Sequence, residues 1–455
     1  MAKTTLKDLS LDDESCVMRS QWGVVNNLDR PHSLEDHVGR VQSKSCILLE
    51  ILQQRGQQFS RLKGDETTNW TGPVIFSDDG SQKPARNGKK RCFRQNIQRQ
   101  TESINSIIIA PCLADIQKKK KRSQRYIELY DGPYDFNSTT CREFRHEIIE
   151  VKVLTMVKTT DLFDRWRNLQ VCKWEQNNVE SNAFKGLLSR CCNAPSFLFT
   201  TKRNTPEGTK LRYEVDTSGI LHIGSEIFKM FPDDMPFSRS QFKKCAVIGN
   251  GGIIKNSKCG KEIDSMDFVF RCNIPPISEK YAVDVGYKTD VVTINPSIIT
   301  ERFQKLEKWR KPFYDVLQAY GNSSVVLPAF YNTRNTDVSF RVKYMLDDFD
   351  SQKGVFFFHP QYLLNVQRFW SLQGVRAKRL SSGLMLVTAA MELCDEVHLY
   401  GFWAFPMNPA GIFITHHYYD NVKPRPGFHA MPHEIFNFLH LHSRGILQVH
   451  TGPCR

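Results

Sequence analysis

"KCAVIGNGGIIKNSKCGKEID", from Lys244 to Asp264, is the stretch that decides the fold. It contains a short apolar run, a glycine turn, and then a helix-like or loop segment. A short apolar run bounded by turn residues is consistent with a strand that is buried on both faces, as strands of parallel sheets are. We therefore expect the chain to become an α/β structure from this stretch onward.

Downstream of this stretch, apolar runs alternate with segments that have helical character. The apolar runs lie at residues 267–273, 290–297, 323–330, 354–360 and 396–403. Two helical segments, "RVKYMLDDF" and "SSGLMLVTAAMELC", fall between them. Strands that alternate with helices imply a sheet covered on both faces. The predicted fold class is α/β, with a Rossmann-like, mainly parallel sheet flanked by helices.

The chain changes character near residue 125. Before it lie polar stretches such as "SDDGSQKPARNGKKR", with many breakers and little periodicity, which predict a disordered, stem-like region over residues 1–124. Residues 125–455 are expected to fold. Within them, the apolar spacing of residues 144–166 predicts one or two helices, and "NAPSFLFTT" (193–201) is interpreted as the approach to a strand.

Composition and charge limit the class of protein. A chain of 455 residues with 40% hydrophobic residues buries a sizeable core, which excludes wholesale disorder. A formal charge of +14 favours an anionic partner. Nucleic acid is disfavoured, because the sequence has no helix-turn-helix signal, no finger-type Cys/His spacing and no basic run interleaved with aromatics.

Cysteines and glycosylation sequons favour the secretory pathway. The thirteen cysteines are widely spaced and form no C-x-x-C pair, which suits disulfides in an oxidising compartment. Sequons stand at Asn69, Asn137 and Asn322, and each is meaningful only in a lumenal protein. The N-terminal residues "MAKTTLKDLSLDDESC" contain neither a signal peptide nor an anchor helix, which conflicts with that interpretation.

Three features lie where a parallel sheet binds its ligands, beyond the carboxyl ends of strands, and the third is a cluster of histidines near the C-terminus. The first is the glycine turn with Gly249, Gly251 and Gly252, which lets the backbone approach a phosphate closely or merely packs. Because Ile254 occupies the last position, the dinucleotide fingerprint is incomplete. The second is 381–383, "SSG", which offers a helix N-terminus to an anion or is an ordinary serine N-cap.

Histidines gather near the C-terminus, with seven of the thirteen between His416 and His450. His429 and His433 are four residues apart, but Pro432 would interrupt a helix that carried both, so a metal site is disfavoured. Asp348–Asp350 forms a D-x-D string after an amphipathic segment, and a solvated helix terminus is the favoured interpretation.

Four stretches, in this order, carry a family resemblance. "CAVIGNGGIIKNSKCGKEIDSMDFVFRCNIPP" resembles the long motif of the eukaryotic sialyltransferases, and "LSSGLMLVTAAMELCDEVHLYGFW" resembles their short motif. "HHYYD" resembles the third motif and "HAMPHE" the very small one. The similarity runs from about residue 125 to Cys454 and is greatest to the α-2,8 branch, among its ganglioside-acting members.

The resemblance implies a fold and a reaction. The fold would be the variant GT-A-type fold of these sialyltransferases, in a lumenal catalytic domain. The reaction would transfer sialic acid from CMP-sialic acid to the 8-hydroxyl of a terminal sialic acid, with inversion and without a metal or other cofactor. The acceptors would be glycolipids, gangliosides above all, with glycoproteins left open. The alternative is a catalytically inactive lumenal protein that binds sialoglycans.

The resemblance also assigns roles to residues of this chain. In the long motif, Asn250 and Asn273 would contact CMP-sialic acid. In the short motif, Ser381, Ser382 and Gly383 would hold the carboxylate or phosphate side of the donor, with Trp403 lining the pocket.

The last two motifs would supply the chemistry. His417 would donate to the phosphate leaving group and His429 would be the general base, since an imidazole suits proton transfer near neutral pH. Glu434 would give a supporting hydrogen bond, and His433 would only cap or pack.

Covalent links and location follow from the same resemblance. It implies disulfides Cys245–Cys394 and Cys259–Cys454, and it leaves Cys272 without an assigned partner. It further implies residence at the Golgi membrane with the catalytic domain in the lumen, homo- or hetero-oligomers with other glycosyltransferases, and no nucleic-acid partner.

Overall fold

The computed structural model describes residues 133–216, 218–237, 242–422 and 427–454, which all belong to one folded unit. The predicted stem over residues 1–124, with Asn69 and the expectation about an anchor, lies outside the described residues. Among the described helices, none has both the length and the apolar character needed to cross a membrane.

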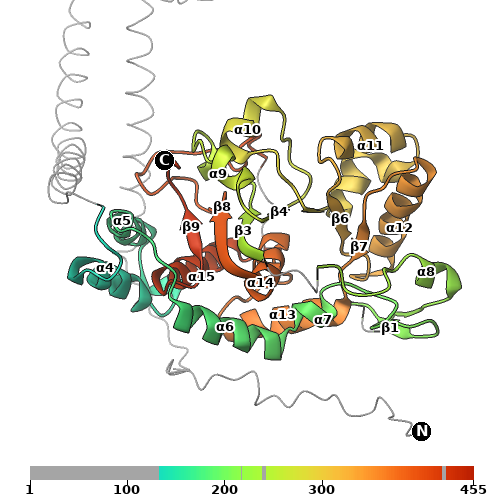
Figure 1. The fold of residues 1–455 in the computed structure, drawn as a ribbon, viewed down its shortest axis with the longest axis horizontal. Coiled ribbons are helices and arrows are strands. Elements are labelled where there is room, and N and C mark those ends of the chain that lie inside the picture. The colour runs from blue at the N-terminus through green and yellow to red at the C-terminus, as the bar shows by residue number, and fades with distance from the viewer. Residues whose placement is uncertain (1–132, 217, 238–241, 423–426, 455) are drawn as a thin grey trace, which may run out of the picture. The chain divides into compact units, whose positions relative to one another are not determined.

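A seven-stranded sheet forms the centre of the fold (Figure 1). Its strands lie in the order β7-β6-β5-β4-β3-β8-β9, and every neighbouring pair is parallel. The strands are β3 (Phe242–Ile248), β4 (Phe268–Arg271), β5 (Val291–Thr293), β6 (Ser324–Leu327), β7 (Val355–Phe357), β8 (Cys394–Tyr400) and β9 (Gln448–His450). The predicted α/β class with a mainly parallel sheet flanked by helices is therefore confirmed.

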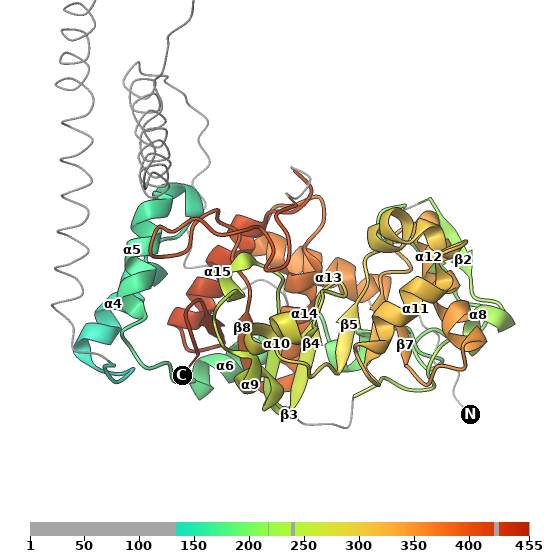
Figure 2. The ribbon, with the colours of Figure 1, turned by 90° about the horizontal axis from the view of Figure 1, so that it is seen from above.

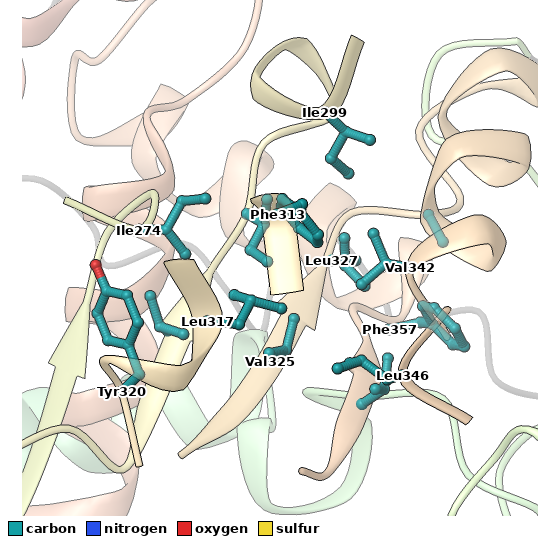
Figure 3. Close-up of a cluster of buried hydrophobic side chains, with 14 of the residues drawn as sticks. Ile274, Ile299, Phe313, Leu317, Tyr320, Val325, Leu327, Val342, Leu346 and Phe357 are labelled. Carbon is teal, nitrogen blue, oxygen red and sulfur yellow. The ribbon is translucent and has the colours of Figure 1, made fainter. Parts of the chain in front are cut away.

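One face of the sheet packs on a large apolar cluster (Figure 3). Alternate residues of the strands, such as Ala246 and Ile248 of β3, point into it because side chains alternate across a strand. The elements that cover this face are α9 (Gly260–Asp264), α10 (Glu279–Val285), the π-helical turn η5 (Ile298–Arg302), α11 (Arg310–Gln318) and α12 (Thr333–Asp348). Figure 1 shows α11 and α12 beside β6 and β7, and Figure 2 shows both helices beside β7.

Helix α14 (Ser382–Leu393) covers the opposite face, in contact with β3 and β8. It is buried on all sides, because α6 (Asn178–Cys191), α7 (Ala194–Phe197) and α13 (Pro360–Leu372) pack behind it. Helix α15 (Met431–Ser443) lies against β9. Small and apolar residues in "SGLMLVTAAMEL" make such an all-round buried helix feasible.

The segment before the sheet holds two helices over the stretch predicted to contain one or two, α4 (Thr139–Ile149) and α5 (Thr159–Leu169). The disulfide Cys141–Cys172 closes this region. The strand approach predicted at 193–201 is wrong in its first half: residues 194–197 form α7, which a proline in its first turn favours. Its second half does approach the sheet, as Phe199 pairs with Phe358 in an isolated antiparallel bridge.

Shorter elements complete the described chain. They are η3 (Leu154–Met156), the hairpin β1 (Lys210–Arg212) and β2 (Ile220–His222), α8 (Ser225–Lys229), η4 (Gly252–Ile254) and η6 (Gln304–Leu306).

Candidate active site

The strand order reverses between β3 and β8, and this reversal locates the candidate site. From β3 the chain builds outward through β4 to β7, then returns to place β8 on the other side of β3. In open α/β sheets ligands bind beyond the carboxyl ends of the strands at such a switch point. Here those ends lead directly into the glycine turn after β3 and into Gly401 after β8.

The glycine turn is explained by backbone packing. The Gly249 N–H donates to Tyr400 O and the Gly251 N–H to Gly401 O, at 2.7 and 2.9 Å. A Cβ on either glycine would lie 2.7 Å from the Gly401 oxygen, and Gly401 itself has φ +72°. The structural interpretation of these glycines is thus confirmed, while their contact with a phosphate remains a prediction.

Side-chain hydrogen bonds hold the two asparagines of the long motif in place. The Asn250 side-chain amide donates to Cys272 O at 2.9 Å. Asn273 has φ +64°, and its Oδ1 accepts from the Asn295 N–H at 3.2 Å. Its amide nitrogen lies 3.4 Å from the Ser382 hydroxyl, so the long and short motifs meet here. Both asparagines are half-buried, which leaves them part of the surface at this edge.

Ser381 is the N-cap of α14. Its hydroxyl oxygen accepts from the Leu384 N–H at 3.1 Å, as expected of an ordinary serine cap. The same hydroxyl donates to Glu434, whose second carboxylate oxygen accepts from the Ser381 N–H at 2.9 Å. Burial raises the pKa of Glu434, and the two hydrogen bonds from Ser381 oppose that rise. Glu434 therefore fixes the start of α14 to the first turn of α15.

The rest of the "SSG" stretch remains nearer the site. Ser382 is half-buried and faces Asn273. Gly383 is buried, and a Cβ there would lie 2.7 Å from the Phe402 ring, so close packing excludes a side chain. Ser382 and the free N–H groups of α14 are the parts of this stretch left to meet a donor anion.

His429 lies just before α15, and Pro432 stands in the first turn of that helix. One helix therefore does not carry both His429 and His433, as predicted from the proline. The His429 Nδ1–H donates to Arg379 O at 2.8 Å, which puts the proton on Nδ1 and leaves the lone pair on Nε2. Burial, and the nearby Arg379 charge, lower the pKa of His429 despite the opposing effect of this hydrogen bond. A neutral imidazole with a free Nε2 is what a general base requires.

The ring of His417, on a different loop, is also oriented through its Nδ1 atom. Its Nδ1 lies 2.7 Å from Asp420 Oδ1, and its ring stacks on Tyr419 at 5.1 Å between centroids. His417 also forms an isolated bridge with Gly251, which ties the third motif to the glycine turn. Burial raises the pKa of Asp420, but the hydrogen bonds from His417 and from the Val422 N–H leave it lower than usual.

Trp403 is placed differently from the other expected residues. Its indole is 4% exposed, and its N–H donates to Met407 O at 2.7 Å. The ring packs on Phe163 and Phe405, at 5.2 Å between centroids in each case. The buried ring supports the wall behind the switch point, and its direct contact with a donor stays a prediction.

The other expected residues are linked by contacts between their loops. His417 is bridged to Gly251, Asn250 bonds the residue before Asn273, and Asn273 meets Ser382. A pocket of about 510 Å³ lies at His429, and no other expected site residue is among those that line it. Its wall is formed by Ser371, Arg376, Ala377, Lys378, Gly427, Phe428 and His429.

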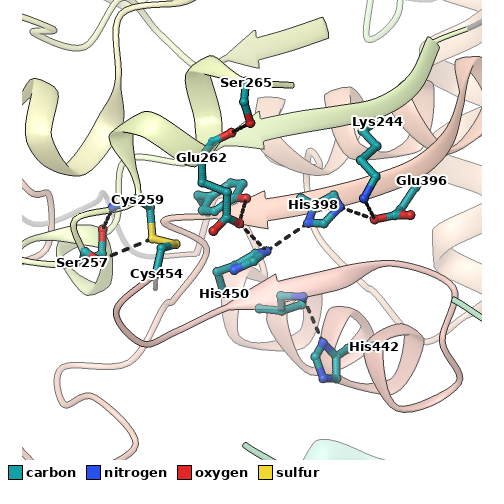
Figure 4. A network of polar contacts seen from close by, with 12 residues as sticks. Lys244, Ser257, Cys259, Glu262, Ser265, Glu396, His398, His442, His450 and Cys454 are labelled. Atoms are coloured by element: carbon teal, nitrogen blue, oxygen red, sulfur yellow. Dashed lines mark hydrogen bonds and ion pairs between the residues drawn. A yellow bond between two sulfur atoms is a disulfide. The ribbon is translucent and has the colours of Figure 1, made fainter. Parts of the chain in front are cut away.

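Three groups able to ligate a metal ion converge elsewhere among the described residues, on α9, β8 and β9 (Figure 4). They are Glu262, His398 and His450. His398 Nδ1 and His450 Nε2 are 3.1 Å apart, and the ring centroids are 5.4 Å apart with 26° between the planes. The two nitrogens therefore face each other almost head-on, which suits an N–H···N hydrogen bond rather than two lone pairs that converge on one ion.

The remaining expectations are also located. Disulfides Cys245–Cys394 and Cys259–Cys454 are both present, and Cys272 is a free, buried thiol. Asn137 and Asn322 are exposed, as glycosylation would require. Asp348 ends α12 and pairs with Arg310, so the D-x-D string is a helix terminus as expected.

Sequence reasoning missed two residues that orient the histidines. Arg379 holds His429 through its carbonyl, while its guanidinium is 3.2 Å from the buried carboxylate of Glu214. Asp420 orients His417 and is the last residue of "HHYYD", so the motif contained that signal. Arg379 and Glu214 are 165 positions apart, and no local pattern could have indicated their pairing.

Together, the parallel sheet, its switch point and an oriented histidine beside a pocket are the features of an α/β protein with a ligand site. The family model of glycosyltransferase family 29 (sialyltransferase) matches residues 199–446. The chain belongs to this family, the sialyltransferases, and is a glycosyltransferase that depends on CMP-sialic acid.

Curated relatives confirm the resemblance to the α-2,8 branch. The human protein named "Alpha-2,8-sialyltransferase 8E" is 75% identical over 351 residues, which cover 77% of this chain and 93% of that protein. The mouse protein of the same name is 63% identical over 401 residues, 88% of this chain and 89% of that protein. That coverage exceeds residues 125–455, so the similarity extends further toward the N-terminus than expected.

Proteins that are less similar to this chain are also named sialyltransferases. The Xenopus tropicalis "Alpha-N-acetylneuraminide alpha-2,8-sialyltransferase" is 46% identical over 282 residues, 62% of this chain and 81% of that protein. Among solved structures, a mammalian sialyltransferase is 26% identical with a TM-score of 0.34, over 46% of this chain and 70% of that chain.

Proposed function

We propose that this chain is an inverting, metal-independent α-2,8-sialyltransferase that extends the terminal sialic acid of glycolipids. The observation that carries the proposal is His429, whose Nδ1 is committed to Arg379 O and whose Nε2 is left free beside a pocket. The names of the relatives support the α-2,8 linkage, since proteins up to 75% identical to this chain are named α-2,8-sialyltransferases.

The proposed reaction replaces one C–O bond by another and moves one proton. The 8-hydroxyl oxygen of the acceptor attacks C2 of the donor sialic acid, and its proton passes to His429 Nε2. The bond between C2 and the phosphate oxygen breaks with its electron pair left on CMP. Attack from the face opposite the leaving group inverts the configuration at C2. Because the His429 pKa is lowered by burial, the base is already deprotonated near neutral pH.

Departure of CMP needs its charge to be stabilised. His417 is proposed to give a proton or a hydrogen bond to the phosphate from Nε2, because Asp420 occupies its Nδ1 side. The N–H groups at the start of α14 and the Ser382 hydroxyl supply further donors. Such oriented donors can take the place of a metal ion in stabilising a leaving phosphate, and this supports the proposed metal independence.

The compartment and partners belong to the same proposal. Three disulfides among the described residues require an oxidising compartment, and the lumen of the Golgi apparatus fits the family. Acceptors on glycolipids would be presented at the Golgi membrane. Glycoprotein acceptors and assembly with other glycosyltransferases remain predictions of the resemblance.

The test compares two histidines of one motif. His429→Ala should lower transfer from CMP-sialic acid to a sialylated glycolipid by about 10²–10⁴-fold, as loss of a general base does. His433→Ala is the matched control and should retain near-normal turnover. Both variants should bind CMP with unchanged affinity by calorimetry, and activity in EDTA should equal activity without it.

Each outcome has a consequence. Near-normal turnover of His429→Ala would refute the base assignment. Activity lost in EDTA and restored by Mn²⁺ would refute metal independence. A wild-type protein that binds sialoglycans but releases no CMP would refute the enzymatic proposal.

A further inference from the structure

The pocket beside His429 carries positive charge and no negative charge among its lining residues. Arg376 and Lys378 stand on the segment that leads from α13 to α14, and both side chains are exposed. Gly427, Phe428 and His429 also line the pocket. An anionic group in this pocket would meet two cations and the candidate base at once.

Arg379, on the same segment, differs from Arg376 and Lys378 because its charge is paired. Arg379 is neutralised by Glu214, with side chains only 11% and 1% exposed, and it also lies over the Tyr331 ring. No carboxylate of the described chain lies within ion-pair distance of Arg376 or Lys378. Arg379 therefore has a structural role, whereas Arg376 and Lys378 line the pocket without a carboxylate partner.

The acceptor has a carboxylate in the right relation to its reacting hydroxyl. A terminal sialic acid bears the carboxylate and the glycerol chain with the 8-hydroxyl on one sugar ring. When the 8-hydroxyl is at His429 Nε2, the carboxylate of the same residue must lie nearby. Arginine holds carboxylates through a planar pair of N–H donors, and lysine adds a second charge. The 39% exposed Phe428 ring offers an apolar wall for the carbon face of the sugar.

We propose that Arg376 and Lys378 form the subsite for the carboxylate of the acceptor's terminal sialic acid, and thereby select sialylated acceptors. This inference rests on the proposed α-2,8 transfer. The donor also carries a carboxylate and a phosphate, so the test must separate the two anions.

The test uses Arg376→Ala/Lys378→Ala with a soluble sialylated oligosaccharide, which removes any contribution of an anionic membrane. The acceptor KM should rise about tenfold or more, because a charge-assisted contact is lost. The donor KM and the slow hydrolysis of CMP-sialic acid by water should not change. Lys308→Ala/Arg334→Ala removes the same charge from exposed positions outside the pocket and should leave the acceptor KM unchanged.

A second acceptor isolates the contact itself. When the acceptor carboxylate is converted to a primary amide, wild type and the pocket variant should have equal acceptor KM values. An unchanged KM for the sialylated acceptor, an equal loss with the amide acceptor, or a rise in the donor KM would each overturn the subsite. Failure of the wild type to extend any sialylated acceptor would instead overturn the proposed function, so the two failures are distinguishable.

Discussion

The two flanks of the sheet are stabilised in different ways. Around β4 to β7 the structure is held by burial of apolar side chains, with Phe313 at the centre of the cluster in Figure 3. Around β8, β9 and α15 the buried groups include Glu434, His398 and His442, and two disulfides are close by. Figure 4 shows the two histidines and the Cys259–Cys454 disulfide. The flank that carries the candidate chemistry depends on directional polar contacts, whereas the other depends on area removed from water. The stability of the polar flank should respond to pH and to single-atom changes. The stability of the apolar flank should respond to changes in side-chain volume.

The largest effect is expected in the apolar flank. Phe313→Ala removes a fully buried ring that packs on Phe303 at 4.9 Å, and should lower the free energy of unfolding by about 3–5 kcal/mol. Urea unfolding measures this loss. Turnover per folded molecule should stay near the wild-type value, because the candidate catalytic residues His417 and His429 are not members of this apolar cluster. A large loss of turnover below the unfolding transition would show that the two flanks are coupled.

The same contrast shows what the sequence could predict. Apolar runs that alternate with helical segments indicated the parallel sheet, and the glycine turn after β3 indicated the ligand edge. These signals are local, because strands and helices impose short periods on the chain. The resemblance supplied the Cys245–Cys394 and Cys259–Cys454 pairs and the catalytic roles, which no periodicity contains, but it did not supply the Cys141–Cys172 pair.

The site's supporting contacts were not predictable from local patterns. Asn273 and Ser382 are 109 positions apart, and Ser381 and Glu434 are 53 apart. Each contact joins two loops whose approach depends on the whole strand order. Trp403 illustrates the limit, since its motif position suggested a pocket wall while the packing of Phe163, from a helix outside the motifs, buries the ring.

A smaller loss of stability, with a larger loss of activity, is expected at Glu434. In Glu434→Gln the amide can still accept one hydrogen bond but turns an NH₂ group toward a Ser381 donor, which should cost about 1–3 kcal/mol of unfolding free energy. Because Ser381 then no longer fixes the start of α14, kcat should fall more than Phe313→Ala makes it fall. Steady-state kinetics below the unfolding transition checks this. Equal kcat values in the two variants would mean that Glu434 serves stability alone.

The effect that is smallest at neutral pH is a change in pH dependence, which develops only as the pH falls. His442 is buried against Trp166, and its Nδ1 accepts from the Val449 N–H at 3.0 Å. A second proton on Nδ1 would break this hydrogen bond. Burial lowers its pKa to about 3 in the folded protein, against an ordinary value of 6.5. The unfolded chain therefore binds a proton first as the pH falls below 6.5, and stability is lost by up to about 1.4 kcal/mol per pH unit until the folded pKa is reached.

His442→Asn offers an amide oxygen to the same N–H but has no group that titrates in this range. Its unfolding free energy should fall less steeply than that of the wild type between pH 6 and pH 4, by up to about 1.4 kcal/mol per pH unit. Denaturant unfolding at several pH values measures the slope, and Phe313→Ala is the control that should keep the wild-type slope. Burial lowers the pKa of His450 well below its ordinary value, with smaller contributions from His398 and His442, so part of the wild-type slope should persist in the variant. Equal slopes in wild type and His442→Asn would place the acid sensitivity of this flank elsewhere, whereas a changed slope in Phe313→Ala would show that the apolar flank shares it.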